Sequence, residues 1–297
     1  MTDMRRGADT SVAETVRSFG LQWNRFRRTQ LDRFNGTTIS RDRLLDSSGW
    51  APDLEGQTVL EAGSGAGRFT QVLLDLGARV LSFDLSAAVL ANRANNGHDP
   101  RLLLAQADIY RIPARPASFD KVLCLGVLQH CPDVAGAFAS LAGYVRPGGE
   151  LVIDVYDIED KNEASKPSYR LRRFSPRMPP RLLFALVRVS VPALLWARRL
   201  LQRYGHRIPF SRTLLAWNPV FDYKGVLPLD DRQLREWAVL DTFDFLAPCY
   251  DNPQHIDAVR GWFQAAGLEL LHLRKGGNGI VGRGRRPAPA STTHGGA

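Results

Sequence analysis

The chain has 297 residues, of which 44% are hydrophobic and 23% are charged, and its net charge at neutral pH is +9. This length and balance predict a folded protein with a sizeable core, and they exclude a wholly disordered chain or a disulfide-stapled miniprotein. The three cysteines form no CxxC pair and have no metal-ligand spacing, which predicts reduced thiols, a cytoplasmic setting and no metal site. The polar residues 1–10 lack the apolar core of a secretory signal.

The positive charge is concentrated in residues 164–221, a segment without Asp or Glu. Its twelve Lys and Arg residues exceed the net charge of the whole chain, so the remainder is slightly acidic. An anionic partner is therefore expected to meet this segment. Because leucines are interleaved with the arginines, nucleic acid is the least favoured of the possible partners.

The first predicted element is an N-terminal helical cap, residues 1–56. Within it, Phe19, Trp23 and Phe26 recur at helical spacing and predict an amphipathic helix with an aromatic face. An aromatic stripe of this kind is usually plain packing.

From Thr58 onward, short β-rich apolar runs alternate with helical stretches. The predicted strands are 58–62, 78–84, 101–108, 119–126 and 149–156, and the predicted helices are 68–76, 86–95 and 134–145. This alternation predicts a parallel sheet with helices on both faces, in a core of residues 57–156. The turn signal RPGGE, residues 146–150, is expected to separate the last helix from the last strand.

Three further segments follow the core. Residues 157–246 are rich in Pro, Arg and Leu and predict a basic helical insertion or lid. Residues 247–283 predict a helix, with Asn252 as its N-cap, Pro253 in its first turn and Gly267 after its end, followed by strands that complete the sheet. Residues 284–297 are predicted to be a disordered tail.

The glycine-rich stretch LEAGSGAGRF carries the strongest functional signal. Gly63, Gly65 and Gly67 lie between a strand and a helix, where a backbone without Cβ atoms lets a ligand approach closely. The third glycine falls one place earlier than in the dinucleotide fingerprint GxGxxG, which disfavours NAD. Asp84, about 20 residues further on, can accept hydrogen bonds from both ribose hydroxyls. Asp108 ends the next strand and could receive an adenine amino group.

In this order, VLEAGSGAGRF, VLSFDLS, QADIYRIP, FDKVLCLGVLQHCPD and VRPGGELVIDVY resemble the class I S-adenosylmethionine (SAM)-dependent methyltransferases. The resemblance implies a Rossmann-like α/β fold with a seven-stranded, mostly parallel sheet, an antiparallel final hairpin and SAM as cofactor. More loosely, LQWNRF, ISRDR and LDTFDFLAPCYDNPQ resemble a bacterial subgroup associated with small-molecule or surface-polysaccharide biosynthesis.

The same resemblance implies a set of cofactor-binding residues. Glu61 and the glycine loop would lie beside the methionine part of SAM, Asp84 on the ribose, and Asp108 with Ile109 at the adenine. The full implied set is Glu61, Gly63, Ser64, Gly65, Gly67, Arg68, Phe69, Asp84, Leu85, Ser86, Asp108, Ile109, Leu125, Gly126 and Val127.

Methyl transfer requires alignment more than a nucleophile on the enzyme, but a hydroxyl acceptor benefits from a base that takes its proton. His130 follows the fourth predicted strand and is the candidate base; its alternative role is to cap or support the cofactor pocket. Tyr156 is a weaker catalytic candidate, and we expect only one of Asp154 and Tyr156 to face the acceptor, because side chains alternate along a strand. A later polar cluster is interpreted as turn and cap residues: Asp241, Asp244, Tyr250 and His255.

The sequence thus predicts a SAM-dependent methyltransferase of a small-molecule acceptor, with a hydroxyl of a saccharide or related biosynthetic intermediate as the preferred target. Two alternatives stay open: a membrane-associated quinone or lipid-linked acceptor, and a non-catalytic SAM-binding regulatory protein. The basic stretch Arg181–Arg207 is expected either to pack as a lid or to contact an anionic membrane peripherally. Arg188 and Pro192 are expected to interrupt its apolar run and to prevent it from crossing a bilayer.

Overall fold

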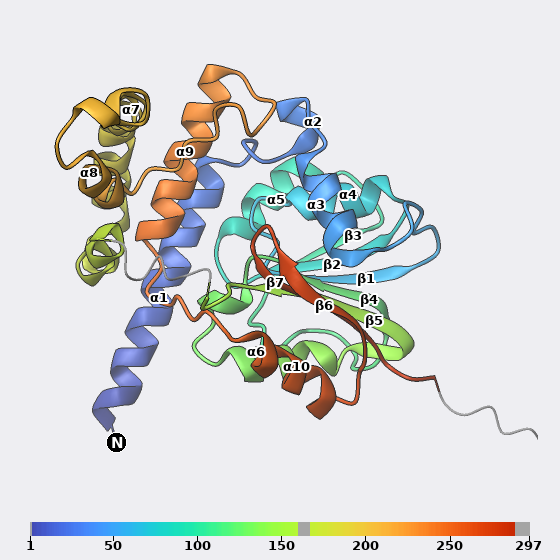
Figure 1. Ribbon diagram of the computed structural model, residues 1–297. Helices are drawn as coiled ribbons and strands as arrows, with labels where there is room; N and C mark the ends of the chain where they lie inside the picture. The colour runs from blue at the N-terminus through green and yellow to red at the C-terminus, as the bar shows by residue number, and fades with distance from the viewer. Residues whose placement is uncertain (1, 160–166, 289–297) are drawn as a thin grey trace, which may run out of the picture.

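A seven-stranded sheet with helices on both faces forms the core of the computed structural model, which describes residues 2–159 and 167–288 (Figure 1). The strand order is β3-β2-β1-β4-β5-β7-β6, and β7 alone runs antiparallel to its neighbours β5 and β6. The strands are β1 (Thr58–Ala62), β2 (Arg79–Asp84), β3 (Leu102–Gln106), β4 (Phe119–Cys124), β5 (Val145–Val155), β6 (Glu269–Gly276) and β7 (Gly279–Arg285). The predicted Rossmann-like fold is confirmed.

The helices beside the sheet form two layers, one on each face (Figure 1). One layer contains α3 (Ile39–Ser48), α4 (Arg68–Asp75) and α5 (Ala88–Asn96), and the other contains α6 (Val134–Ala142) and α10 (Ile256–Ala265). Strand β1 is buried on both faces of the sheet. Val59 packs in the hydrophobic cluster that includes residues of α4, and Leu60, the next residue, packs in the cluster that includes residues of α6. A central parallel strand buried on both faces therefore reads as a continuous apolar run.

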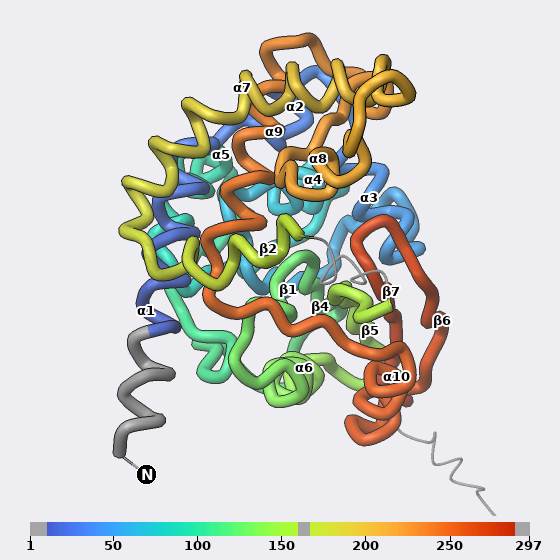
Figure 2. The backbone as a smooth tube through the Cα atoms, turned by 60° about the vertical axis from the view of Figure 1, so that its left-hand side comes forward, coloured from blue at the N-terminus to red at the C-terminus, as the bar shows by residue number. Residues whose placement is uncertain are grey.

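Helix α1 of the N-terminal cap and the helices of the insertion form a separate helical layer, whereas α3 of the cap belongs to the layer on the sheet. The cap comprises α1 (Thr2–Arg25), α2 (Asp32–Asn35) and α3, and the insertion comprises η3 (Pro167–Arg173), η4 (Ser175–Arg177), α7 (Pro180–Tyr204), η5 (Gly205–Arg207), α8 (Ser211–Trp217) and α9 (Asp231–Leu246). Helices α1, α7 and α9 lie side by side (Figure 2). Phe26, the residue directly after α1, packs there with Leu183, Val187 and Phe243.

Helix α7 corrects one expectation. It continues through Pro192 for 25 residues, so neither Pro192 nor Arg188 interrupts it. By length and composition the stretch Pro180–Arg207 would suffice to cross a membrane, although such helices also occur in proteins that do not span one.

Three predicted boundaries were wrong. Strand β5 begins at Val145 and includes residues 146–149, which form an irregularity between the Val145–Phe119 and Glu150–Lys121 pairs. Helix α10 begins at Ile256 rather than near Asn252, whose backbone N–H instead donates to the Gln129 carbonyl at 2.8 Å. Strand β7 extends to Arg285, beyond the predicted start of the tail at 284, and residues 289–297 of that tail lie outside the described residues.

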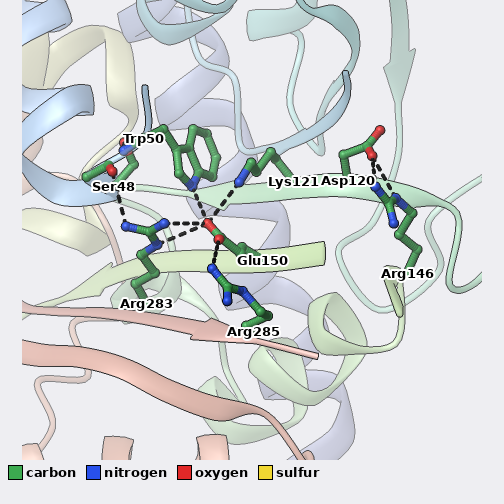
Figure 3. Close-up of polar contacts among 9 residues, drawn as sticks. Ser48, Trp50, Asp120, Lys121, Arg146, Glu150, Arg283 and Arg285 are labelled. Carbon is green, nitrogen blue, oxygen red and sulfur yellow. Dashed lines mark hydrogen bonds and ion pairs between the residues drawn. The ribbon is translucent and has the colours of Figure 1, made fainter. Parts of the chain in front are cut away.

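A buried ionic cluster joins β4, β5 and β7 at the end of the sheet where β1 and β4 begin (Figure 3). The carboxylate of Glu150 accepts hydrogen bonds from Trp50 Nε1 and Lys121 Nζ, each at 2.9 Å. It also forms ion pairs with Arg283 at 2.9 Å and with Arg285 at 3.1 Å. Burial by itself would raise the pKa of Glu150, but Lys121 and the two arginines outweigh it and hold the pKa below its ordinary value.

Candidate functional site

One cavity of about 1350 Å³ lies at the carboxyl ends of the parallel strands, where ligands bind in open α/β sheets. Its floor comes from the loops after β1, β2, β3 and β4. Helix α1 contributes Phe19 and Trp23, and α9 contributes Trp237, Asp241 and Asp244. The cap and the insertion therefore close the site over the sheet, and the aromatic face of α1 is part of the site wall rather than plain packing.

The glycine loop after β1 adopts left-handed backbone conformations, with φ of +71° at Gly63 and +51° at Gly65. A Cβ on Gly63 would lie 2.3 Å from Val127 Cγ2, and one on Gly65 would lie 3.1 Å from the Trp23 ring. Both positions exclude a side chain because neighbouring elements close in on the loop. Gly67 has a different reason, since its Cβ would meet Asn92 and Asn96 of α5, so this glycine serves the packing of α4 on α5.

Asp84 stands at the cavity wall with its carboxylate fixed by the loop that it faces. Its Oδ2 accepts from Gly65 N at 3.0 Å, and its Oδ1 accepts from Ser86 N at 2.8 Å and from Ser86 Oγ at 2.7 Å. Burial raises the pKa of Asp84, and these hydrogen bonds oppose the rise. Three donors leave acceptor capacity on the carboxylate, which fits the hydroxyls of a ribose.

Ser64 gives independent support for a polar ligand at the glycine loop. It is 4% exposed and lines the cavity, and its Oγ has no hydrogen-bond partner among the residues that the structure describes. A buried hydroxyl without a partner costs stability unless a ligand or water satisfies it. The residues at the loop therefore fit a nucleoside with a polar extension.

Asp108 and Ile109, the residues predicted to hold the adenine, lie at the cavity together with Leu85. Tyr110, which the sequence reading missed, lines it as well: its backbone N–H donates to Asp108 Oδ1 at 3.0 Å and its hydroxyl donates to the Asp133 carbonyl at 2.8 Å. An aromatic residue two places after a strand-end acid was the only signal for it.

At the opposite side of the glycine loop, Arg68 lies over the Phe69 ring at 4.5 Å and donates to Gln30 Oε1 at 2.6 Å. Burial, with the neighbouring Arg43 guanidinium, lowers the pKa of Arg68 to about 9, so the side chain remains cationic at neutral pH. This partly buried cation fits the carboxylate of an amino acid.

The loop after β4 forms the remaining cofactor wall, with Leu125, Gly126 and Val127 all at the cavity. Asp154 holds this loop, because its carboxylate accepts from the Gly126 backbone N–H and pairs with Arg43 at 2.7 Å. Among the described residues, no group of three or more His, Cys, Asp or Glu side chains is placed to hold a metal.

Glu61 is not part of the cavity wall, and neither is Gly67. Glu61 is 1% exposed and accepts a hydrogen bond from the Thr70 hydroxyl behind the loop. Burial raises the pKa of Glu61 to about 7. The structure thus places both residues where they support the loop, and direct contact with a cofactor stays a prediction.

His130, in η1 (Leu128–His130), lies in the cavity between two aromatic rings. Its ring centroid is 5.2 Å from that of Phe19 and 5.8 Å from that of Tyr156, both edge-on. Its Nδ1 is 3.0 Å from the Tyr250 carbonyl oxygen. A carbonyl oxygen can only accept, so Nδ1 carries the proton and, in the neutral ring, Nε2 does not. Burial lowers the pKa of His130, although the nearby charge of Asp244 opposes this shift. The lowered pKa keeps the ring neutral at physiological pH.

The expectation that only one of Asp154 and Tyr156 faces the site was wrong. Both residues line the cavity, because positions two apart in extended chain share a face. Asp154 supports the β4 loop, as described above, while the Tyr156 ring stands against His130. Burial raises the pKa of Tyr156 well above its ordinary value, so the phenol stays protonated.

The interpretation of Asp241 and Asp244 as turn or cap residues was also wrong. Both lie in the C-terminal half of α9 and line the cavity. Asp241 accepts a hydrogen bond from the Tyr223 hydroxyl, and burial raises its pKa to about 7. Gln22 Nε2 donates to Asp244 Oδ1 at 2.9 Å. Tyr250 lines the cavity too. His255 is outside the cavity and is the N-cap residue of α10.

The wall on this side combines acids with aromatic rings from the insertion. Beyond the residues already described, it is formed by Tyr169, Arg172, Phe221, Tyr223, Trp237, Phe245 and Asp251. Such a surface offers flat apolar faces and several hydrogen-bond acceptors, and it lies next to His130. We interpret it as the acceptor side of the cavity.

The Asp84 assignment makes a direct prediction. Asp84→Ala should weaken the binding of SAM and of S-adenosylhomocysteine by about 1–3 kcal/mol, because the ribose hydroxyls lose their charged partner. Calorimetric titration measures this, with Asp99→Ala, outside the cavity, as the matched control. An unchanged affinity in a folded Asp84→Ala variant would remove Asp84 from the site.

The strand order, the bare loop after β1 and the fixed carboxylate after β2 together define a nucleoside-binding α/β domain of the methyltransferase type. Comparison with a protein-family model agrees, since residues 60–153 match the family described as "Methyltransferase domain". Residues 60–153 are thus similar to the class I SAM-dependent methyltransferases, a family whose cofactor is SAM.

Individual relatives match only part of this chain. An uncharacterised protein of Synechococcus is 28% identical over 235 residues, which is 75% of this chain and 50% of that protein. A ubiquinone biosynthesis O-methyltransferase of Sodalis glossinidius is 33% identical over 113 residues, covering 37% of this chain and 44% of that protein. The chain thus spans about half the length of the curated relatives that it matches.

A solved structure supports the fold over nearly the whole chain. It is a putative methyltransferase in complex with the Trm112 methyltransferase activator of Haloferax volcanii, with a TM-score of 0.53 and 13% identity. The alignment covers 91% of this chain and 97% of that one. At this identity the likeness concerns the fold alone.

Proposed function

We propose that the chain transfers the methyl group of SAM to a hydroxyl oxygen of a small-molecule acceptor, a saccharide or a related biosynthetic intermediate. The observation that carries the proposal is His130: a neutral imidazole inside the cavity, with Nδ1–H engaged by the Tyr250 carbonyl and Nε2 available as a base.

SAM, when bound, supplies a methyl group made electrophilic by its sulfonium. Gly63, Gly65 and Asp84 would hold its amino-acid and ribose parts, and Asp108 its adenine. The tight fit at the glycine loop and the unpaired Ser64 hydroxyl support this placement.

His130 would take the acceptor proton as the new carbon–oxygen bond forms. The resulting imidazolium is favoured by the carboxylates of Asp244 and Asp251, whose charges raise the pKa of His130. The Tyr250 carbonyl keeps the ring oriented throughout. Helices α1 and α9 cover the cavity and would exclude water from the transfer.

The acceptor side supports a polyhydroxylated ligand. Asp241 and Asp244 present carboxylates from successive turns of α9, and each can accept hydrogen bonds from hydroxyl groups. Tyr223 and Trp237 add aromatic faces beside them. Aromatic faces with interspersed carboxylates suit the apolar faces and polar edges of a sugar ring. The looser likeness to a saccharide-associated bacterial subgroup points the same way.

A membrane-associated acceptor, quinone or lipid-linked, is the second candidate. It is favoured by the exposed apolar side of α7 and by the similarity of the core to ubiquinone biosynthesis O-methyltransferases. The chemistry at His130 would be the same in both cases.

Incubation with methyl-labelled SAM and fractionated cell extract tests the proposal. The expected result is label in the aqueous, saccharide-containing fraction, released by reagents that cleave methyl ethers and not by mild base. Label in the lipid fraction instead would select the second candidate. SAM binding without label transfer to any fraction, and no effect of His130→Ala, would contradict both and favour a non-catalytic binding protein.

A further inference from the structure

Helix α7 has two apolar faces, and only one of them is used inside the molecule. Leu183, Val187, Val191 and Leu195 are buried, at 5%, 3%, 0% and 3% exposure, against α9 and α1. A second stripe at the same helical spacing points away from that contact. It is formed by Leu182, Leu186, Val189 and Trp196, which are 50%, 51%, 79% and 67% exposed.

Helix α8 continues the exposed surface. Phe210, at 81% exposure, precedes it, and Leu214 and Trp217 on the helix are 51% and 44% exposed. Helices α7 and α8 lie on the outside of the molecule, with α1 and α9 between them and the sheet (Figure 1). We call the exposed residues of α7 and α8 the outer surface. Helices α7 and α8 contact each other, and each carries several exposed apolar side chains, so these residues are not scattered singly over the molecule, which marks an interaction site.

The positive charge of the outer surface indicates which kind of partner it binds. Arg181, Arg188 and Arg203 are exposed on α7 and Arg212 is exposed on α8. Arg198 and Arg199, by contrast, are used internally, on the Val220 carbonyl and on Asp222. Because no acid occurs in residues 164–221, a second copy of this surface would bring like charges together.

We propose that the outer surface docks on an anionic lipid bilayer, with α7 lying in the plane of the interface. Trp196 and the aliphatic stripe would enter the headgroup and acyl boundary, and the exposed arginines would meet lipid phosphates. A membrane-spanning position conflicts with the fold, because Val187 and Val191 would have to leave their contacts with α9. This inference concerns binding and does not depend on methyl transfer.

Docking of the outer surface on a bilayer would also bring the acceptor side of the cavity close to the lipid. The chain leaves α8 and runs directly through Phe221, Tyr223 and Leu227, which line the acceptor side of the cavity. A bilayer held against α7 and α8 would therefore lie beside the segment that forms the acceptor wall.

Co-sedimentation of the full chain with vesicles tests the proposal. Binding is expected to phosphatidylcholine vesicles containing phosphatidylglycerol and not to pure phosphatidylcholine. It should fall steeply as salt rises from about 0.1 M to about 1 M, over which the screening length shrinks from about 10 Å to about 3 Å. The triple variant Arg181→Gln, Arg188→Gln and Arg203→Gln should lower the partition coefficient roughly a hundredfold, since each basic residue at an anionic surface contributes about fivefold.

A second variant separates insertion from charge. Val189→Ser with Trp196→Ser should lower binding about tenfold or more, through lost apolar contact. Matched controls are Leu103→Ser, which removes an exposed leucine (69%) from β3, and the triple change Arg79→Gln, Arg93→Gln and Arg115→Gln. Each control should bind as the unchanged chain does. The stabilisation by S-adenosylhomocysteine should be the same in every variant, which verifies folding.

Three outcomes would overturn the proposal. The first is binding that is equal on neutral and anionic vesicles, or absent from both. The second is binding that resists high salt and alkaline washing, as a membrane-spanning helix would, and the third is a dimer in sedimentation velocity that the Val189→Ser and Trp196→Ser changes dissociate, with no binding to vesicles.

Discussion

His130→Ala is expected to lower kcat about 10²- to 10⁴-fold, the range that a positioned general base contributes. The affinity for S-adenosylhomocysteine should change less than about threefold, because the side chain acts on the acceptor proton and not on the nucleoside. Single-turnover kinetics with methyl-labelled SAM measures the first quantity and calorimetry the second. His98→Ala, outside the cavity, is the control and should retain full activity.

The pH profile gives this prediction a second readout. Burial places the pKa of His130 below its ordinary value of 6.5, so the base form persists from neutral pH down into the acidic range. The rate should stay constant between about pH 7 and about pH 8, below the pKa of Arg68, and on the acidic side it should fall only when pH drops below the lowered pKa of His130. His130→Ala should lose this limb. An active variant with an unchanged limb would mean that His130 only supports the pocket.

Glu150→Ala is expected to destabilise the fold by about 2–4 kcal/mol, because Lys121, Arg283 and Arg285 would face one another without their shared carboxylate. The value lies toward the lower part of the range for broken buried ion pairs, since Arg285 is 45% exposed and water can reach it. Urea unfolding measures the free energy, with Glu55→Ala, at an exposed position, as the control.

The sign of the pH effect follows from the lowered pKa. Glu150 in the unfolded chain protonates near 4.5 and in the folded chain only at lower pH. Its stabilisation is therefore complete above about pH 5 and is lost as pH falls through the folded pKa. Glu150→Ala should lack this part of the acid dependence. A Glu150→Ala variant as stable as the unchanged chain would show that the cluster contributes no net stability.

The sequence predicted the sheet and the cofactor half of the site because their signals are local. A strand, a bare loop and a following helix are contiguous, and Asp84 reaches Gly65 because β1 and β2 are neighbours in register, with Ala62 paired to Phe83. Parallel strands end at one edge, so the motif residues that follow them converge without further information.

The acceptor half was not predictable in the same way. Phe19 and Trp23 reach the cavity only because α1 packs beside α9, and Asp241 and Asp244 face it only in that packing. From the sequence alone, the aromatic stripe indicates packing in the core, and the two aspartates indicate turn or cap residues. Tertiary pairing also overrode the local turn signal at the start of β5, because Val145 already pairs with Phe119 of β4 and residues 146–149 form an irregularity within the strand.

The most direct test of the account is calorimetric titration of S-adenosylhomocysteine into the full, folded chain. The account predicts one binding site per chain, abolished or strongly weakened by Gly63→Val, whose side chain would collide with Val127. Gly261→Ala, at a position outside the cavity with open space and an ordinary backbone conformation, should leave binding intact. No heat of binding from well-folded protein would contradict the assignment of the cavity to SAM.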